Sequence, residues 1–171
     1  MNNRLRQHFT DERGFSLIEL LVVILVIGIL AAIAIPSFLN QKTKAYDASA
    51  KELVRTAETT AEAISTGGSG TYAGVSQSTL NSYEPTIQTS TVTAGANAWV
   101  SAAAPFPGSP NSYYVVATAY NTGDQFEIER SSNGQLARLC GGPAWTPQET
   151  SFNATPSYTG RAIGGCSDGS W

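Results

Sequence analysis

The 171-residue sequence predicts an α+β fold, in which the second half of one long amino-terminal helix packs on an antiparallel β-meander. Three observations predict this class. An apolar run lies near the start, an amphipathic stretch rich in Ala, Lys and Glu follows it, and strand patterns separated by turns occupy the last third. They divide the chain into a leader, an apolar helix, the amphipathic half of that helix, a variable loop region and a sheet with a carboxyl-terminal loop. The predicted ranges are 1–14, 15–39, 40–66, 67–111 and 112–171.

The apolar helix is long enough to cross a membrane. From Leu20 to Ile35, sixteen consecutive residues lack a polar side chain, and about 20 apolar residues span a bilayer as a helix. Arg4, Arg6 and Arg13 precede the run. Because short cytoplasmic segments are enriched in Lys and Arg, we expect the amino terminus in the cytoplasm and the bulk of the chain outside.

One carboxylate, Glu19, lies near the start of the apolar run. An isolated charge within a membrane helix is costly, so such residues usually face a partner. A free amine at Phe15 would be four residues away, and it exists only if the chain is cut after Gly14. Such a cut explains Gly14 and Glu19 together, since the carboxylate of one chain could then meet the new amine of a neighbour and fix the register between subunits.

The stretch from Gly14 to Glu19 reads GFSLIE and is followed by the apolar run. It resembles the type III signal of type IV prepilins, which proteins of type II secretion pseudopili and competence pili share. The resemblance is strong over residues 13–40 and diffuse afterwards. It implies cleavage between Gly14 and Phe15 by a prepilin peptidase, N-methylation of Phe15, and a role for Glu19 in subunit assembly.

The resemblance implies the type IV pilin fold and a structural subunit of a type IV pilus, a homopolymeric filament. Its other partners would be the pilus assembly platform, its ATPase machinery, and the cytoplasmic membrane before assembly at the cell surface. The Ser/Thr-rich loop and the carboxyl-terminal cysteines favour a major pilin over a type II secretion pseudopilin or a minor pilin.

Three other readings of the amino terminus stay open at this point. The sequence Ala32-Ile33-Ala34 also fits a secretory signal, and cleavage there would release a secreted binding module. A simple signal anchor and a membrane-tethered enzyme are the others.

Two residues interrupt the helical pattern of the run. Pro36 lacks the N–H that would bond the carbonyl of Ala32, and Gly28 lowers helix propensity. We therefore expect the helix to kink or loosen there, and the resemblance implies that this part is partly extended in assembled pili.

After Pro36 the pattern predicts an amphipathic helix that ends at Gly67 and Gly68. Its apolar stripe follows spacings of three and four and consists of Tyr46, Ala50, Leu53, Ala57, Ala61 and Ile64.

Residues 67–111 are rich in Ser, Thr, Gly, Ala and Pro, with weak signals for a short strand or helix near Ser76–Tyr83 and Ala98–Ala103. From Ser112 the strand signals are clear. The stretches SYYVVATAY, QFEIER and QLARLC are separated by the turn sequences NTGD and SSNG. They predict an antiparallel meander of at least three strands, with one face on the helix and one facing water.

Cys140 and Cys166 are the two cysteines, and an even number outside the membrane fits a disulfide. Its loop of about 27 residues would stabilise the fold by roughly 3.5 kcal/mol. Two free thiols are the alternative. In pilins a similar loop forms part of the exposed subunit surface.

The sequence predicts no enzyme, no cofactor and no metal. His8 is the one histidine and lies in the predicted leader, so histidine-based catalysis is excluded for the processed chain. Asp124, Glu127 and Glu129 could hold Ca²⁺, but the alternation of the strand favours a solvated face for them. A net charge of −3 disfavours nucleic acid as a partner.

Overall fold

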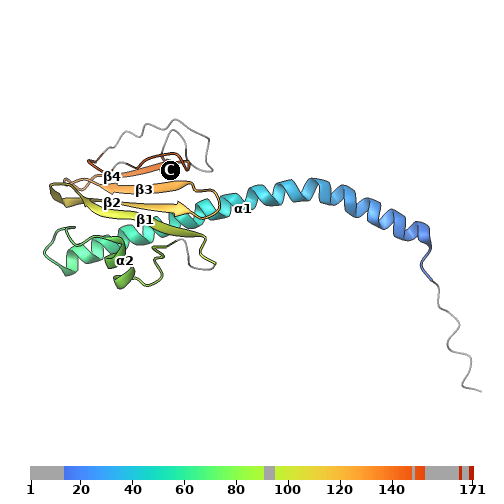
Figure 1. Ribbon diagram of the computed structural model, residues 1–171, viewed down its shortest axis with the longest axis horizontal. Coiled ribbons are helices and arrows are strands. Elements are labelled where there is room, and N and C mark those ends of the chain that lie inside the picture. The colour runs from blue at the N-terminus through green and yellow to red at the C-terminus, as the bar shows by residue number, and fades with distance from the viewer. Residues whose placement is uncertain (1–13, 91–94, 148, 153–165, 167–169) are drawn as a thin grey trace, which may run out of the picture. The chain divides into compact units, whose positions relative to one another are not determined.

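The computed structural model describes residues 14–90, 95–147, 149–152, 166 and 170–171 (Figure 1). The chain divides into two compact units, residues 1–40 and residues 41–171. The described residues form one long helix, one short helix and four strands, in that order. This arrangement confirms the predicted α+β class.

The long helix, α1, comprises Leu17–Gly67 and runs without interruption through Gly28 and Pro36. In the isolated chain the helix therefore continues past both residues. A break at these positions stays a prediction for the assembled filament, where neighbouring copies would surround the helix.

The part of α1 in the first unit has no core. Its large hydrophobic side chains, from Leu17 to Leu39, are 48–80% exposed. An 18-residue window of this helix has a mean hydropathy of 3.1 and is not buried by the rest of the chain. By length and composition, α1 can cross a membrane.

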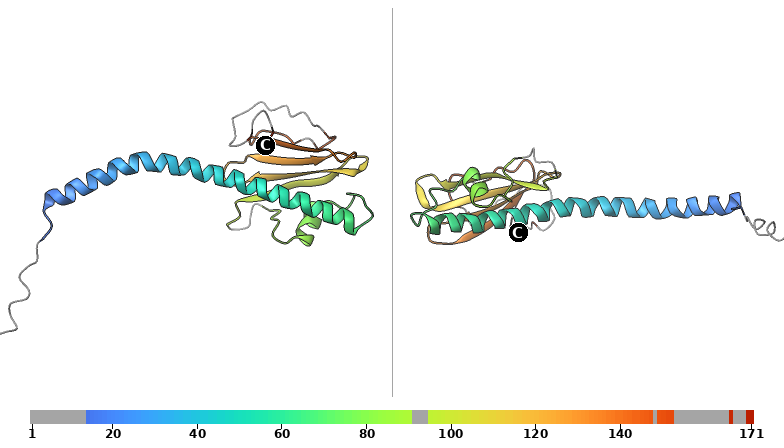
Figure 2. Two further views of the ribbon diagram at one scale, coloured as in Figure 1. Left: turned by 180° about the vertical axis from the view of Figure 1, so that it is seen from behind. Right: turned by 90° about the horizontal axis from the view of Figure 1, so that it is seen from below.

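The part of α1 in the second unit lies against one face of the sheet (Figure 2). Its buried residues include four of the six in the predicted stripe, namely Ala50, Ala57, Ala61 and Ile64. Tyr46 and Leu53 are only partly buried, whereas Val54 is fully buried. The helix is therefore rotated slightly toward Val54 from the orientation that the sequence predicted.

The sheet is a four-stranded antiparallel meander in the order β1-β2-β3-β4. Three of these strands have clear signals in the sequence. The fourth, β1 (Ala98–Phe106), lies in the region 67–111, where the strand signals are weak. The short helix α2 (Gln77–Tyr83) lies in the other weakly predicted stretch, Ser76–Tyr83. The side-chain amide of Gln77 in α2 donates a hydrogen bond to the carbonyl of Val100 in β1 at 2.7 Å. The bounds are Gln77–Tyr83 for α2, and Ala98–Phe106, Ser109–Ala119, Gln125–Arg130 and Leu136–Gly141 for β1 to β4.

The two faces of the sheet carry separate apolar clusters. Toward α1, the core includes Val115, Ala117, Phe126 and Ile128. On the opposite face, Phe106, Tyr114 and Val116 form a smaller cluster, against which Phe152 packs from the segment after β4.

The prediction that Asp124, Glu127 and Glu129 form a solvated face is wrong. All three are at most 1% exposed. Glu127 is paired across the strands with Val116, and Glu129 with Tyr114. Both pairs lie on the face that bears the second cluster, where Phe152 covers part of the sheet.

The predicted disulfide is present. Cys140, at the end of β4, is bonded to Cys166, and their Cα atoms are 6.1 Å apart. The enclosed residues 153–165 lie outside the described part of the chain. Beyond them, Ser170 forms a bridge with Leu139 of β4, so the end of the chain is fastened to the sheet at two points.

Candidate processing and assembly site

Gly14 and Phe15 lie three and two residues before Leu17, the first residue of α1. Phe15 is 86% exposed. A Cβ atom built on Gly14 would meet nothing within 4 Å, and the residue does not adopt the positive φ that favours glycine. Nothing in the described fold therefore requires glycine here. The preceding leader, residues 1–13, lies outside the described part of the chain.

Ser16 and Glu19 cap the start of α1 reciprocally. The backbone N–H of Ser16 donates to Glu19 Oε2 at 2.8 Å, and the backbone N–H of Ile18 donates to Ser16 Oγ at 3.4 Å. Helix starts leave several N–H groups unpaired, and the pattern Ser-x-x-Glu satisfies two of them. Glu19 thus has a role within its own chain that the sequence interpretation missed, although the capping pattern was readable.

The capping geometry places the carboxylate beside the predicted cut. Because Oε2 of Glu19 bonds to the N–H of Ser16, the carboxylate lies one residue from the nitrogen of Phe15. A negative group is also favourable at a helix start, where the unpaired N–H groups carry partial positive charge. The pairing of Glu19 with an amine at Phe15, in the same chain or in a neighbour, stays a prediction.

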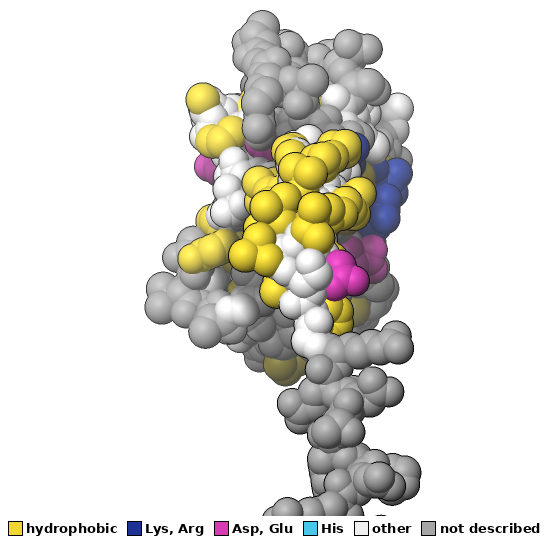
Figure 3. Space-filling view, turned by 90° about the vertical axis from the view of Figure 1, so that its right-hand side faces the viewer, with side chains coloured by type: hydrophobic (Ala, Val, Ile, Leu, Met, Phe, Trp, Pro, Cys, Tyr) yellow, Lys and Arg dark blue, Asp and Glu magenta, His cyan; other side chains and the backbone are white. Residues whose placement is uncertain are grey.

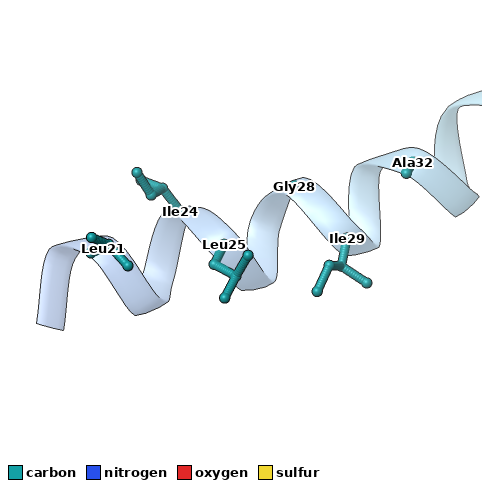
Figure 4. Close-up of a pocket in the computed structure, with 6 residues that line it drawn as sticks. All are labelled: Leu21, Ile24, Leu25, Gly28, Ile29 and Ala32. Carbon is teal, nitrogen blue, oxygen red and sulfur yellow. The ribbon is translucent and has the colours of Figure 1, made fainter. Parts of the chain in front are cut away.

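Gly28 lies in the middle of an apolar face of the exposed half of α1. The residues around it recur at spacings of three and four, and the missing side chain leaves a shallow hollow between them (Figure 4). As at Gly14, a Cβ would meet nothing within 4 Å. The lining residues are Leu21, Ile24, Leu25, Gly28, Ile29 and Ala32.

The surface at this end of α1 is correspondingly apolar. In the space-filling view, the described side chains nearest the viewer are mostly hydrophobic (Figure 3). Small residues let two helices approach closely in an apolar medium, where packing rather than hydrophobic burial drives association. The hollow at Gly28 is therefore suited to a side chain of another helix.

Glu62 joins the other half of α1 to the sheet. It accepts hydrogen bonds from the hydroxyls of Tyr72 at 2.7 Å and Tyr113 at 3.1 Å. It also pairs with Arg130 of β3, the Nη1–Oε1 distance being 3.2 Å. The rings of Tyr72 and Tyr113 have their centroids 4.6 Å apart. The partners of Glu62 are far away in sequence, so no local pattern indicates this cluster.

The cluster changes the acidity of both tyrosines. Burial, and then the nearby charge of Glu62, raises the pKa of Tyr113 far above its ordinary value. Burial and the hydrogen bond to Glu62 also raise the pKa of Tyr72. The neutral phenols donate and the partly exposed carboxylate accepts, so the hydroxyls of the two buried tyrosines are hydrogen-bonded.

Trp171 fastens the end of the chain to the same helix. Its indole N–H donates to the carbonyl of Leu139 at 2.8 Å. Three cations lie over its ring at 5.0–5.9 Å from the centroid, namely Lys51, Arg55 and Arg138. Burial lowers the pKa of Lys51. Such cation–π contacts add to the attachment of the chain end to α1 and β4.

The described residues contain no group of three His, Cys, Asp or Glu side chains placed to hold a metal ion. Both cysteines are bonded to each other.

Comparisons with known proteins match the amino-terminal part of the chain. A family model described as the prokaryotic N-terminal methylation motif matches residues 10–35. The type IV major pilin protein PilA of Myxococcus xanthus (strain DK1622) is 52% identical over 40 residues, which are 23% of this chain and 18% of that protein. The match thus spans less than a fifth of the relative. No solved structure matches the chain significantly.

The exposed apolar helix, the four-stranded antiparallel sheet and the disulfide agree with the type IV pilin fold. The matched range includes Gly14, Phe15 and Glu19 and extends into the first half of α1. The chain carries the N-terminal methylation motif of prokaryotic prepilins.

Proposed function

We propose that this chain is a structural subunit of a type IV pilus, polymerised through the first half of α1. The observation that carries the proposal is the combination of the methylation motif with an apolar helix that its own chain leaves exposed. A helix that is hydrophobic on all sides needs lipid or other such helices around it. The relative is named as a major pilin, which favours that role over a pseudopilin or a minor pilin.

Processing would occur between Gly14 and Phe15 by a prepilin peptidase, with methylation of the new amine. The described part of the fold needs no glycine at position 14, since a Cβ there would meet none of its atoms within 4 Å. The reason for glycine is then expected in an enzyme that must reach the backbone closely.

Before assembly, the chain would lie in the cytoplasmic membrane with Arg4, Arg6 and Arg13 inside and the second unit outside. Lipid tails are as apolar as Leu and Ile, so moving the helix from lipid into a filament gains little hydrophobic free energy. Close packing at surfaces such as Gly28 and the Glu19–amine pair would favour the filament, and an ATPase-driven assembly machine would supply the work of extraction.

The first test is an intact mass with amino-terminal sequencing of the protein purified from its own cells. We expect a chain that starts at Phe15, about 14 Da heavier than the unmodified form if methylated once. The Cys140–Cys166 bond lowers the mass by about 2 Da. A chain that starts at Ile35 would overturn the proposal, because Glu19 would then belong to a discarded signal.

The second test separates the two roles of Glu19. Glu19→Ala removes both the cap and the charge, whereas Glu19→Gln keeps an acceptor for the Ser16 N–H and removes the charge alone. If the amine pair drives assembly, both variants should lose pili in electron micrographs of sheared cell-surface fractions.

Glu52→Gln, at an exposed glutamate in the second half of α1, is the matched control and should leave pili at normal number. Normal pili from Glu19→Gln would show that Glu19 acts through the cap and would contradict the pairing mechanism.

A further inference from the structure

A short collar of α1, residues 40–45, separates the apolar run from the part of the helix that packs on the sheet. All of its side chains are exposed except Thr43, which is half-buried. Packing against the rest of the second unit begins immediately afterwards, with Asp47 buried and Tyr46 partly buried.

The collar carries two cations, Lys42 and Lys44, and no acid. In sequence the nearest acid on one side is Glu19, and on the other it is Asp47, which accepts a hydrogen bond from Thr122 at 2.8 Å. Within the described part of the chain, neither ammonium forms an ion pair with a carboxylate. Lys42 lies over the ring of Tyr46, 5.9 Å from its centroid.

The two lysines lie on opposite sides of the helix. Each residue advances an α-helix by about 100°, so positions 42 and 44 differ by about 200°. A partner docked on one side of the helix would therefore reach one lysine. A layer of negative charge that surrounds the helix would reach both.

The spacing of the lysines from the apolar run matches the thickness of a headgroup layer. They follow Leu39, the last residue of the apolar run, by three and five positions. At 1.5 Å per residue this is about 4.5 and 7.5 Å along α1. The polar layer of a bilayer is roughly 5–7 Å thick on each side of the hydrocarbon core.

We propose that Lys42 and Lys44 bind the phosphates of anionic phospholipid headgroups in the outer leaflet and set the depth of the subunit in the membrane. The proposal rests on the membrane stage of the proposed function. Cleavage after Gly14 removes Arg4, Arg6 and Arg13, so Lys42 and Lys44 are then the Lys and Arg side chains nearest to the span. Each lysine near an anionic surface should strengthen the preference for such lipids by up to about fivefold.

The test uses the processed full chain in phosphatidylcholine vesicles with traces of spin-labelled phosphatidylglycerol or phosphatidylcholine. Electron paramagnetic resonance gives the ratio of their association with the protein. We expect a severalfold preference for phosphatidylglycerol. The ratio should fall close to one in the double variant Lys42→Gln/Lys44→Gln and should be intermediate in each single variant. For the unaltered chain it should also fall close to one in 1 M salt, where charges are screened within about 3 Å.

The matched control is Arg55→Gln/Arg138→Gln, which removes two cations as well. Arg55 lies eleven positions beyond Lys44, about 16 Å along the helix and well past the screening length of about 8 Å at physiological salt. The control should keep the preference of the unaltered chain.

Flotation of the vesicles precedes this measurement. A chain that does not float with lipid would overturn both this inference and the membrane stage of the proposed function. A chain that floats without preferring phosphatidylglycerol, or whose preference survives in the double lysine variant, would overturn this inference alone. If that variant keeps its lipid preference but forms no pili, a second copy of the chain occupies the collar instead.

Discussion

The two halves of α1 differ in the size of their apolar residues and in what covers them. The first half is built of Leu, Ile and Val, and its large side chains are at least 48% exposed. The second half buries smaller residues, including Ala50, Ala57 and Ala61, at 0% exposure. Small side chains let a helix lie close to a sheet, whereas large ones present area to lipid or to other helices.

Among the described residues, the core clusters therefore include no side chain from the more hydrophobic half of the helix. The stability of the second unit should depend on positions of modest hydrophobicity, and assembly on positions that the unit does not use. The comparison can be tested by making the same substitution in both halves.

The largest expected effect comes from Val54→Ala compared with Val23→Ala. Val54 is fully buried in the main core, whereas Val23 is 53% exposed. Removing two buried methyl groups and leaving a small cavity should lower the free energy of unfolding by about 2 kcal/mol. Val23→Ala should change it by less than about 0.5 kcal/mol.

The measurement is urea unfolding in detergent micelles, followed by the fluorescence of the tryptophans. Equal losses in the two variants would mean that the first half of α1 supports the second unit, and the comparison would fail. Pili assembled from each variant give the complementary readout, since Val23 lies in the half of α1 through which the chain is proposed to polymerise.

Features that local sequence determines were predictable, and the ones that depend on distant segments were not. The apolar run, the GFSLIE motif and the stripe through Ala57 and Ile64 follow from spacing along one element. The disulfide follows from two cysteines in a chain whose apolar segment predicts export of the remainder. Motif and spacing thus indicated the long helix, the proposed cut and the class of fold.

The features that the sequence mispredicted or did not indicate depend on contacts between segments that are distant along the chain. Glu127 and Glu129 alternate with apolar residues as a solvated face would, but the segment after β4 packs on that side through Phe152. The strand β1 is poor in strand-forming residues, and its pairing with β2 decides its conformation. The cluster around Glu62 joins residues that are 10 and 51 positions apart.

The second prediction compares two glutamates of the second half of α1. Glu62→Gln removes the charge that pairs with Arg130 and accepts from two tyrosines. Because the site is only partly buried, we expect a loss of about 1.5 kcal/mol in the free energy of unfolding.

Glu52→Gln is the control. Glu52 is paired with Arg55 on the surface, the closest nitrogen–oxygen distance being 3.7 Å, and its side chain is 75% exposed. Such pairs contribute little, so the change should be below about 0.5 kcal/mol. If both variants lose the same amount, attachment of the helix to the sheet does not depend on the Glu62 cluster.

The smallest expected effect is a loss of stability in alkali that Tyr113 causes. Its pKa is raised in the folded chain, chiefly by burial and then by Glu62, so the folded state keeps a proton that the unfolded state releases above about pH 10. The stabilising effect is complete below that pH and is lost as the pH rises. At pH 10.5 the loss should be about 0.8 kcal/mol.

Tyr113→Phe should remove this contribution and flatten the dependence of unfolding free energy on pH between 9 and 10.5, as urea titrations at each pH would show. The slopes are compared, because the substitution also removes the hydrogen bond to Glu62 at every pH. An unchanged slope would mean that Tyr113 ionises as readily in the folded chain as in the unfolded one. Water would then reach the contact between the sheet and the second half of α1 more readily than its buried alanines indicate. The difference in burial between the two halves of α1 would be smaller.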